Sequence, residues 1–243
     1  MAALTFARRC TKEILRDPLN LAFGLGFPVV LLLLLSAIQA NIPVALFEIS
    51  RLAPGIAAFG LSFLTLFSAT LIARDRESAL LQRLYTTPLR PFHYIAGYLL
   101  PMLPMAMGQS ALCYLVALVL GLTPSMHILS AIVAVVPVAL VYISLGLLCG
   151  SLLNVKQVGG VCGALLTNMS AWLSGIWFDL SLVGDGFRNV ANALPFVHGV
   201  LWQQEILAGH HAQALPHLLP VLVYGVLIFI TAVACFFRQM RRQ

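Results

Sequence analysis

Four of the six histidines lie near one another in the carboxyl-terminal part of the chain, and histidine is a common zinc ligand. They are His198, His210, His211 and His217. Adjacent histidines do not necessarily converge on one ion, no cysteine lies among the four, and carboxylates are few there. We therefore interpret them as residues of a surface loop and predict no metal site.

Catalysis within a membrane requires a nucleophile and a base at the depth of the bilayer. The stretch Trp172-Leu-Ser-Gly175 lacks the first glycine of the Gly-x-Ser-Gly motif of six-helix serine proteases, and His217 lies only at the end of an apolar run. Neither His-Glu-x-x-His nor the phosphate-binding motif Gly-x-x-x-x-Gly-Lys-Ser/Thr occurs. The sequence therefore predicts no catalytic residues and no ATPase site of this kind, and an intramembrane enzyme is the weakest alternative.

Composition and run length indicate that most of the chain lies in lipid. Apolar residues make up 60% and charged residues 9% of the 243 positions, whereas a soluble domain carries about 25% charged residues. Six long runs contain no Asp, Glu, Lys or Arg: 19–40, 52–73, 97–120, 127–150, 157–178 and 215–237. A helix needs about 20 apolar residues to cross a bilayer, and the runs do not alternate as β-barrel strands do. We predict an all-α integral membrane protein with six transmembrane helices in a domain over 19–243.

The basic residues predict the orientation of these helices. If the amino terminus is cytosolic, six crossings place every Lys and Arg except Arg51 and Arg188 on the cytosolic side. Short cytosolic loops of membrane proteins carry an excess of these residues. We therefore expect a multi-pass protein of the cell (inner) membrane with both termini in the cytoplasm. The net charge of +6 is interpreted as this topology signal, and no nucleic-acid partner is expected.

Residues 1–18 are a separate amino-terminal segment, in which 3–17 have the spacing of an amphipathic helix at the membrane interface. The expected apolar face comprises Ala3, Phe6, Ala7, Cys10 and Ile14, and Arg8, Lys12 and Arg16 lie elsewhere on the helix. Such a helix can bury its apolar face among lipid headgroups while its cations meet anionic lipid. Pro18 is expected to end it. The alternative is a basic tail that only sets the topology.

The stretch from Arg74 to Arg90 is unusually charged for a segment that directly follows an apolar run. At helical spacing, one side carries Leu80, Leu81, Leu84 and Tyr85, and other sides carry Arg76 and Arg83. A short cytosolic helix with an apolar and a charged face is suited to docking into a groove of another protein. We predict such a coupling helix within 74–92, with a solvated loop as the alternative.

The same segment carries the residues of a family signature. Arg76 and Glu77 are followed by Leu81 and Leu84, then by Thr87-Pro88-Leu89, and Gly97 lies in the next apolar run. This arrangement resembles the signature after the second transmembrane helix of type-2 ATP-binding-cassette (ABC) permeases. The resemblance extends over the whole chain, from the amphipathic first helix to the long outer segment before the last span. The chain departs from the family pattern, which has Gly, Thr, Glu and Lys, at Ala79, Leu80, Gln82 and Tyr98.

The resemblance implies a permease subunit that is not itself an enzyme. In this family two six-helix permease chains, identical or different, form a dimer. Two copies of a separate ABC ATPase subunit bind ATP and Mg and dock on the cytosolic helices, so that the complex is an ATP-driven translocase. The residues to which the resemblance assigns ATPase coupling are Arg76, Glu77, Leu81, Arg83 and Leu84.

Aromatic residues recur at four-residue spacing in two of the runs. They are Phe59, Phe63 and Phe67 in the second run, and Trp172 follows Asn168 in the fifth. Most such stripes are packing or lipid contacts. In the family that the chain resembles, however, the second and fifth helices line the central translocation cavity. We therefore expect Phe63, Phe67, Asn168 and Trp172 to contact an exported hydrophobic or amphipathic substrate, such as a drug, an antibiotic, a lipid or a glycan.

The outer segment 179–214 is too long for a tight turn, and residues 187–193 and 197–208 have the composition of two short helices. It resembles the re-entrant outer helices that precede the last span in type-2 permeases. The alternative function is that of a stand-alone secondary transporter or channel. The interiors of the spans contain no Asp, Glu, Lys or Arg, which argues against a pump that is coupled to ions through a buried carboxylate.

Overall fold

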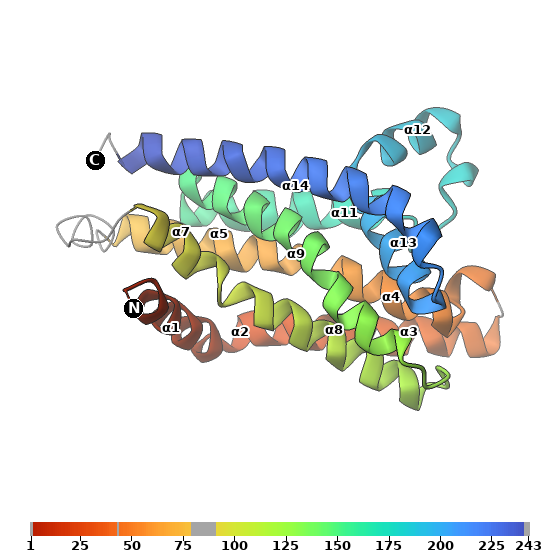
Figure 1. Cartoon of the computed structure of the whole chain (residues 1–243). Helices are drawn as coiled ribbons and strands as arrows, with labels where there is room; N and C mark the ends of the chain where they lie inside the picture. Colours follow the sequence, from red (N-terminus) through yellow and green to blue (C-terminus); the bar gives the residue numbers. More distant parts are fainter. Residues whose placement is uncertain (1, 43, 79–90, 241–243) are drawn as a thin grey trace.

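The computed structural model describes residues 2–42, 44–78 and 91–240, and within these ranges it contains helices and no strand (Figure 1). In chain order the elements are α1 (Ala2–Arg16), α2 (Pro18–Leu21), the π-helix η1 (Ala22–Gly26), α3 (Phe27–Asn41), η2 (Ala45–Phe47), α4 (Ile49–Gly60), α5 (Ser62–Glu77), α7 (Pro91–Leu99), α8 (Met102–Val119), α9 (His127–Leu152), α10 (Val155–Val158), the π-helix η3 (Gly159–Leu166), α11 (Thr167–Leu173), η4 (Leu180–Leu182), α12 (Asp185–Ala193), α13 (Pro195–Ala208) and α14 (His211–Met240). The prediction of an all-α protein is confirmed.

Five helices of the described chain are long and apolar enough to cross a membrane. They are Ala22–Asn41, Ile49–Glu77, Phe92–Val119, His127–Leu152 and His211–Gln239, and each overlaps one of the predicted runs. The remaining predicted run, 157–178, lies largely in the continuous helix formed by α10, η3 and α11. That helix is not among the five, and it carries polar residues such as Lys156 and Asn168. The membrane class is confirmed, and the count of six crossings stays a prediction.

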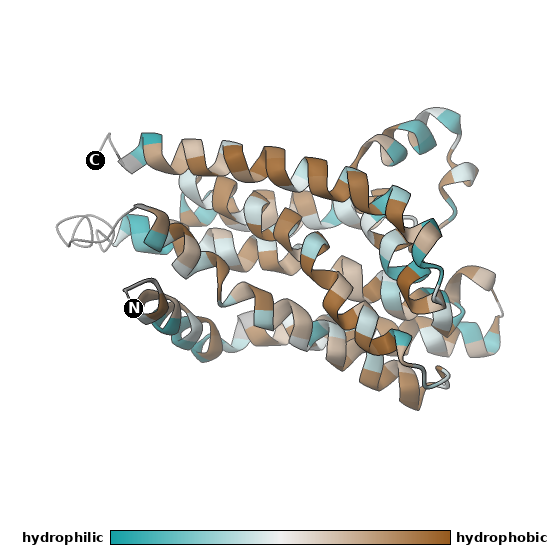
Figure 2. Ribbon diagram, viewed as in Figure 1, coloured by the Kyte–Doolittle hydropathy of each residue, from teal (hydrophilic) through white to brown (hydrophobic). Residues whose placement is uncertain are grey.

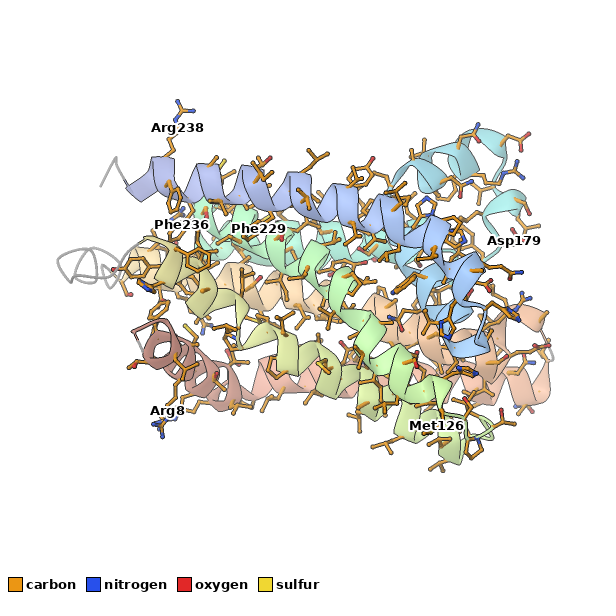
Figure 3. All side chains as sticks on the ribbon, in the orientation of Figure 1. Arg8, Met126, Asp179, Phe229, Phe236 and Arg238 are labelled. Carbon is orange, nitrogen blue, oxygen red and sulfur yellow. The ribbon has the colours of Figure 1, made fainter. Side chains whose placement is uncertain are left out.

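The long helices lie side by side in one bundle (Figure 1). At the bundle's centre, α9 packs against both α5 and α14. Helix α1 begins and α14 ends at the same end of the bundle, which carries Arg8 and Arg238 and is called the terminal end below (Figures 1 and 3). Met126 and Asp179 lie at the opposite end, called the far end (Figure 3). Hydrophilic residues concentrate toward the two ends, and a hydrophobic band lies between them, as a bilayer requires (Figure 2).

The second predicted span forms the centre of the bundle. In Ile49–Glu77, 89% of the most apolar stretch is buried, against 11% in His211–Gln239. Two glycines of α9 let α5 approach closely, because a Cβ on Gly146 would lie 1.7 Å from the hydroxyl oxygen of Ser68. A Cβ on Gly150 would lie 2.7 Å from the carbonyl oxygen of Ala69. Gly-x-x-x-Gly spacing of this kind is a common means of packing helices in membranes.

Helix α1 forms where the amphipathic helix was predicted, but its apolar face is not turned toward lipid. The Phe6 ring packs edge-on against Tyr98, with ring centroids 5.1 Å apart. Gly97 makes room for it, since a Cβ there would lie 2.2 Å from the ring. Phe6 and Ile14 are buried within the protein. The expectation that this face lies among lipid headgroups is therefore wrong, because α7 covers it.

The far end contains the two predicted outer helices, α12 and α13. Helix α13 packs against α4, α9 and α14. Its Trp202 donates a hydrogen bond from Nε1 to the carbonyl oxygen of Ala134 at 2.7 Å. Gly209, with φ of +81°, ends α13 in the left-handed conformation that glycine adopts without strain. Helix α13 thus packs among the spans at the position of the predicted second outer helix.

Candidate functional site

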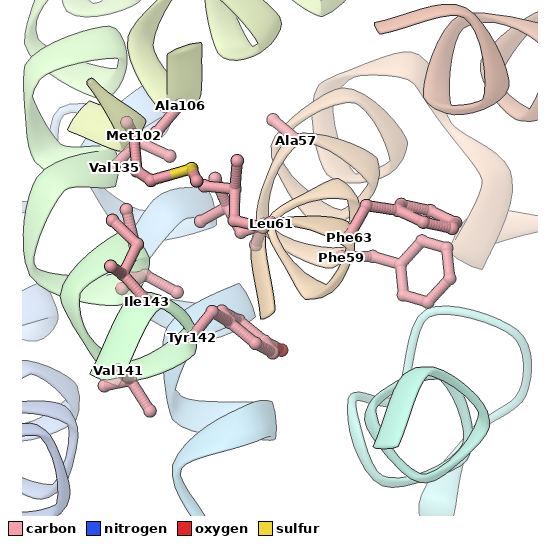
Figure 4. Close-up of a cluster of buried hydrophobic side chains, with 14 of the residues drawn as sticks. Ala57, Phe59, Leu61, Phe63, Met102, Ala106, Val135, Val141, Tyr142 and Ile143 are labelled. Atoms are coloured by element: carbon pink, nitrogen blue, oxygen red, sulfur yellow. The ribbon is translucent and has the colours of Figure 1, made fainter. Parts of the chain in front are cut away.

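Aromatic side chains from several parts of the chain surround a hollow of about 570 Å³, called the aromatic hollow below. Its lining residues are Phe23, Phe27, Phe59, Phe63, Gly163, Thr167, Asn168, Ala171, Trp172, Trp177 and Phe178. Figure 4 shows the rings of Phe59 and Phe63 pointing away from the side on which Leu61 approaches Val135. The same helical segment therefore packs into the core with one face and lines the hollow with the aromatic rings of the other face.

Phe63 is the centre of the aromatic cluster. Its ring centroid lies 6.2 Å from that of Phe23, 5.4 Å from that of Phe27 and 6.1 Å from that of Phe59. Phe59 in turn contacts Trp177, with centroids 6.0 Å apart. Offset and edge-to-face contacts at such distances are favourable, so the rings support one another as a wall.

The fifth predicted span and the segment after it bring the polar groups of the hollow. Trp172 is 56% exposed, which is a large exposure for an indole in a closely packed bundle. The side-chain nitrogen of Asn168 donates to the carbonyl oxygen of Ala164 at 2.8 Å, while its side-chain oxygen is an acceptor. Among the buried polar atoms that the structure describes, Nε1 of Trp177 has no hydrogen-bond partner. Apolar walls with a few polar groups are typical of sites for small organic molecules.

Three of the four predicted cavity residues, Phe63, Asn168 and Trp172, lie at the hollow, but Phe67 does not. Phe67 is 2% exposed, and its ring fills the space beside Gly24, where a Cβ would lie 2.5 Å from it. Each four-residue step advances about 40° beyond a full helical turn, so the stripe drifts around the helix and its third ring faces η1. Phe23 and Phe27 also line the hollow and were not predicted, although their four-residue spacing in the first span was an available signal.

Arg76 and Glu77 bind the ends of two successive helices at the terminal end. Arg76 donates from Nη1 to the carbonyl oxygen of Ser151 and from Nη2 to that of Leu153 at 2.5 Å, where α9 ends. Glu77 accepts from the backbone N–H of Val155, the first residue of α10, at 2.8 Å. A cation suits the free carbonyls at a helix carboxyl end and an anion the free N–H groups at an amino end. We call this set of contacts, which fixes α5 to the turn between α9 and α10, the coupling joint.

The coupling joint contains only part of the predicted docking surface. Leu81, Arg83 and Leu84 lie outside the described residues, as do residues 79–90 of the predicted helical segment 74–92. The partners of Arg76 and Glu77 in the structure belong to the same chain. The ATPase-coupling role of all five residues stays a prediction.

Asp75 is the buried centre of a second set of contacts, one residue before the joint. It is 1% exposed and accepts two hydrogen bonds from Arg9 of α1, each at 2.5 Å, and one from the Tyr98 hydroxyl at 2.8 Å. Burial lowers the pKa of Arg9, but the hydrogen bonds and charge of Asp75 outweigh burial and raise this pKa above its ordinary value. Tyr98 stands where the resembled family has Lys, so the chain keeps a donor there. Sequence reasoning missed Asp75 because Arg9 is 66 positions away.

The histidines predicted for a surface loop lie mostly in helices at the far end, His198 in α13 and both His211 and His217 in α14. His198 and His217 place their Nδ1 atoms 3.1 Å apart, which joins α13 to α14. His210 lies 3.1 Å from the carboxylate of Glu205. In the described part of the chain, no three residues among His, Cys, Asp and Glu are close enough to hold a metal ion.

The sequence profile of a family described as ABC-2 type transporter matches residues 2–208. The chain belongs to the ABC-2 type transporter family. The match covers α1 to α13 and so includes the aromatic hollow, the coupling joint and Asp75. As an ABC-2 permease, the chain is a multi-pass membrane protein and a transmembrane permease subunit of an ABC transporter. The family implies an ABC ATPase partner and usually a second permease. A search of curated proteins found no match.

Proposed function

We propose that this ABC-2 permease exports a hydrophobic or amphipathic molecule, such as a drug, an antibiotic, a lipid or a glycan, through the aromatic hollow. The observation that carries the proposal is the exposed Trp172 in the same hollow as the Phe63 ring cluster. Aromatic walls bind apolar cargo without demanding one geometry. The side-chain oxygen of Asn168 supplies an acceptor for a polar group of the cargo.

A second permease chain, identical or different, completes the hollow in this proposal. Trp172 is 56% exposed in the single chain, so its indole is accessible to a second permease chain. Two hollows that face each other would form one central cavity between the chains. In this arrangement the cargo passes between two permeases and not through one bundle.

We place the terminal end in the cytoplasm and treat the helix from α10 to α11 as the sixth crossing. An odd number of crossings would leave the start of α1 and the end of α14 at opposite ends of the bundle, whereas both lie at the terminal end (Figure 1). Basic residues concentrate in the segments at that end, among them Arg8, Lys12 and Arg238. Such an excess favours the cytosolic side.

ATP is hydrolysed, in this proposal, by two copies of a separate ATPase that dock on 74–92 through Arg76, Glu77, Leu81, Arg83 and Leu84. The coupling joint supports this role, because it ties α5 to α10 through Glu77. Further along, α5 carries Phe63, and the helix that begins with α10 carries Trp172. A displacement of the joint would therefore move two walls of the hollow together. The ATPase drives this change only if it binds one conformation of the permease better than the other.

The proposal is tested by co-purification of the chain with an ABC ATPase, followed by ATP-driven export in vesicles that contain both. Phe63→Ala, Asn168→Ala and Trp172→Ala should each change the rate or range of export while the complex still forms. Leu129→Ala is the matched control, because Leu129 is 63% exposed and does not line the hollow. Phe67→Ala should lower stability instead of altering the choice of cargo.

Two results would contradict the proposal. Unchanged export by all three hollow variants would remove the hollow from the cargo path. Cargo movement by the purified permease in vesicles without any ATPase would favour a stand-alone transporter or channel.

A further inference from the structure

The outer face of α1 carries two cations that have no acidic partner in the described part of the chain. Arg8 and Lys12 are about one helical turn apart, and both are exposed. The nearest carboxylates in the sequence are engaged elsewhere, since Glu13 pairs with Arg9 at 2.6 Å and Asp17 pairs with Arg74 at 3.5 Å. This face of α1 is therefore locally positive.

Two exposed leucines flank the cations on the same side of the helix. Leu4 is 71% exposed and lies one turn before Arg8, and Leu15 is 60% exposed and lies about one turn after Lys12. Exposed leucines beside cations are costly in bulk water and are typical of a helix at a membrane surface. The face that α7 leaves uncovered is thus the face that suits lipid.

A groove leads from the two cations along the outer surface of α8. A hollow of about 880 Å³ is lined by Arg8 and Lys12, and an apolar groove of about 540 Å³ extends along α8 as far as Leu115. The two spaces meet, because Pro101 and Pro104 line both of them. Pro101 lies at the break between α7 and α8, where it cannot donate a backbone hydrogen bond to continue the helix.

The length of the groove matches one leaflet of a bilayer. Pro104 and Leu115 are eleven positions apart on α8, which corresponds to about 16 Å along a helix at 1.5 Å per residue. The hydrocarbon core of a bilayer is about 30 Å thick, so one leaflet contributes about half of that. The groove therefore has the length for an acyl chain whose headgroup lies at α1.

We infer that the cation pair and the groove bind one anionic phospholipid. Its phosphate lies between Arg8 and Lys12, and one acyl chain follows α8 toward Leu115. Charge complementarity selects an anionic headgroup, because a zwitterionic lipid would bring a cation toward the same two side chains. The bound lipid would hold α1 from outside, while Arg9 holds it to Asp75 from inside. This site does not depend on an ATPase or on any cargo.

The charge at the site is tested with the purified, delipidated full chain in neutral detergent. Binding of phosphatidylglycerol and of phosphatidylcholine with the same acyl chains is measured by native mass spectrometry. Phosphatidylglycerol should bind more tightly, and the double variant Arg8→Gln/Lys12→Gln should weaken its binding by roughly thirtyfold. Arg188→Gln/Arg238→Gln removes the same charge outside the groove and should leave binding nearly unchanged.

The groove is tested by filling it. Gly108 lines the groove, and a Cβ there would meet no heavy atom within 4 Å, so Gly108→Leu places a side chain in the acyl path without a clash at Cβ. It should abolish binding of phosphatidylglycerol. Gly26→Leu is the matched control, because a Cβ at Gly26 also meets nothing within 4 Å and Gly26 does not line the groove. Gly108→Val provides the same comparison if leucine at this position prevents folding.

Three outcomes would overturn the inference. Equal affinity for the two lipids would exclude recognition of the charge, and unchanged binding by folded Gly108 variants would exclude the groove. Glycerol 3-phosphate, which has no acyl chain, should not compete at the concentrations at which phosphatidylglycerol binds. If glycerol 3-phosphate competed as well as phosphatidylglycerol, the site would bind only the anionic group and not an acyl chain. None of these results would alter the ABC-2 assignment or the proposed export.

Discussion

Helix α5 holds its side chains in two different ways along its length. At its terminal end, three successive residues bind different elements through charged hydrogen bonds. Asp75 binds α1 and α7, Arg76 binds the end of α9, and Glu77 binds the start of α10. Around Phe63 the contacts are between aromatic rings, and the adjoining hollow contains the exposed Trp172.

The difference fits the two tasks of a transporter subunit. Hydrogen bonds to charged groups require a particular distance and direction, so they transmit a displacement from one helix to the next. Contacts between rings tolerate small rotations and offsets, which suits cargo of variable shape. We therefore expect substitutions at the terminal end to lower stability or coupling, and substitution of the exposed Trp172 in the hollow to alter the cargo with little loss of stability.

The largest loss of stability is expected for Arg9→Gln. The change leaves the buried carboxylate of Asp75 without its cation. Breaking a buried ion pair costs about 3 kcal/mol at the lower end of the usual range, which applies here because the Arg9 side chain is 36% exposed. Equilibrium unfolding in mixed micelles measures the loss.

The neighbouring Arg8→Gln, measured in the same micelles without lipid, is the control for this change, since Arg8 is exposed on the same helix. The double variant Arg9→Gln/Asp75→Asn should recover part of the stability, because it removes the unpaired charge. If Arg9→Gln lowered the free energy of unfolding no more than Arg8→Gln does, the Arg9–Asp75 contact would not stabilise the terminal end.

A smaller loss is expected for Tyr98→Phe, which removes one hydrogen bond to the Asp75 carboxylate. A hydrogen bond to a charged group contributes about 1.5–3 kcal/mol, and Arg9 still satisfies the carboxylate in this variant. The loss should therefore lie near the lower value. Tyr98→Lys restores the residue of the resembled family and should be more stable than Tyr98→Phe if the ammonium reaches Asp75. If Tyr98→Phe were as stable as the native chain, Tyr98 would act only by packing against Phe6.

The contacts at the terminal end also show where sequence reasoning stopped. The charged run after the second span marked Arg76 and Glu77 as important, but their partners at Leu153 and Val155 are backbone groups. A backbone group has no side-chain identity that a sequence pattern can reveal. Spacing therefore identified the charged residues without identifying what they bind.

The helices themselves were predictable because apolar run length depends on the thickness of the bilayer alone. The aromatic hollow was partly predictable, because four-residue spacing correctly placed Phe63 at it. Residues at this spacing drift around the helix, so Phe67, two steps after Phe59, faces Gly24 instead of the hollow. The burial of α1 was not predictable from its amphipathic pattern. An apolar helix face fits lipid and protein equally well, and only Gly97 in α7 indicates that a ring occupies this place.

A still smaller loss of stability, about 1 kcal/mol, is expected for Glu77→Lys. The substitution removes an acceptor at the start of α10 and places a cation at a helix amino end. ATP-driven export should nevertheless fall at least tenfold if Glu77 joins the ATPase to the hollow, and export assays in vesicles measure this.

Glu77→Gln separates the two roles of this residue. The amide oxygen of Gln can still accept from Val155, so stability should be close to that of the native chain. Reduced binding of the ATPase by this variant would assign the carboxylate charge to docking. If Glu77→Lys exported at the native rate, the joint would hold the fold without coupling it to ATP hydrolysis.

The smallest loss of stability, roughly 0.5 kcal/mol or less, is expected for Trp172→Ala, because an exposed side chain gives up few contacts on truncation. Trp202→Ala is the matched control, since Trp202 is only 9% exposed and donates a hydrogen bond to Ala134, so its truncation should cost about 3 kcal/mol. Unfolding of the two variants and export by the two complexes are measured together. A large loss of export with native-like stability for Trp172→Ala assigns this indole to cargo. If Trp172→Ala unfolds as readily as Trp202→Ala, the hollow is a packed part of the fold. The hollow beside Phe63 would then not differ from the terminal end of α5 in its tolerance of substitution.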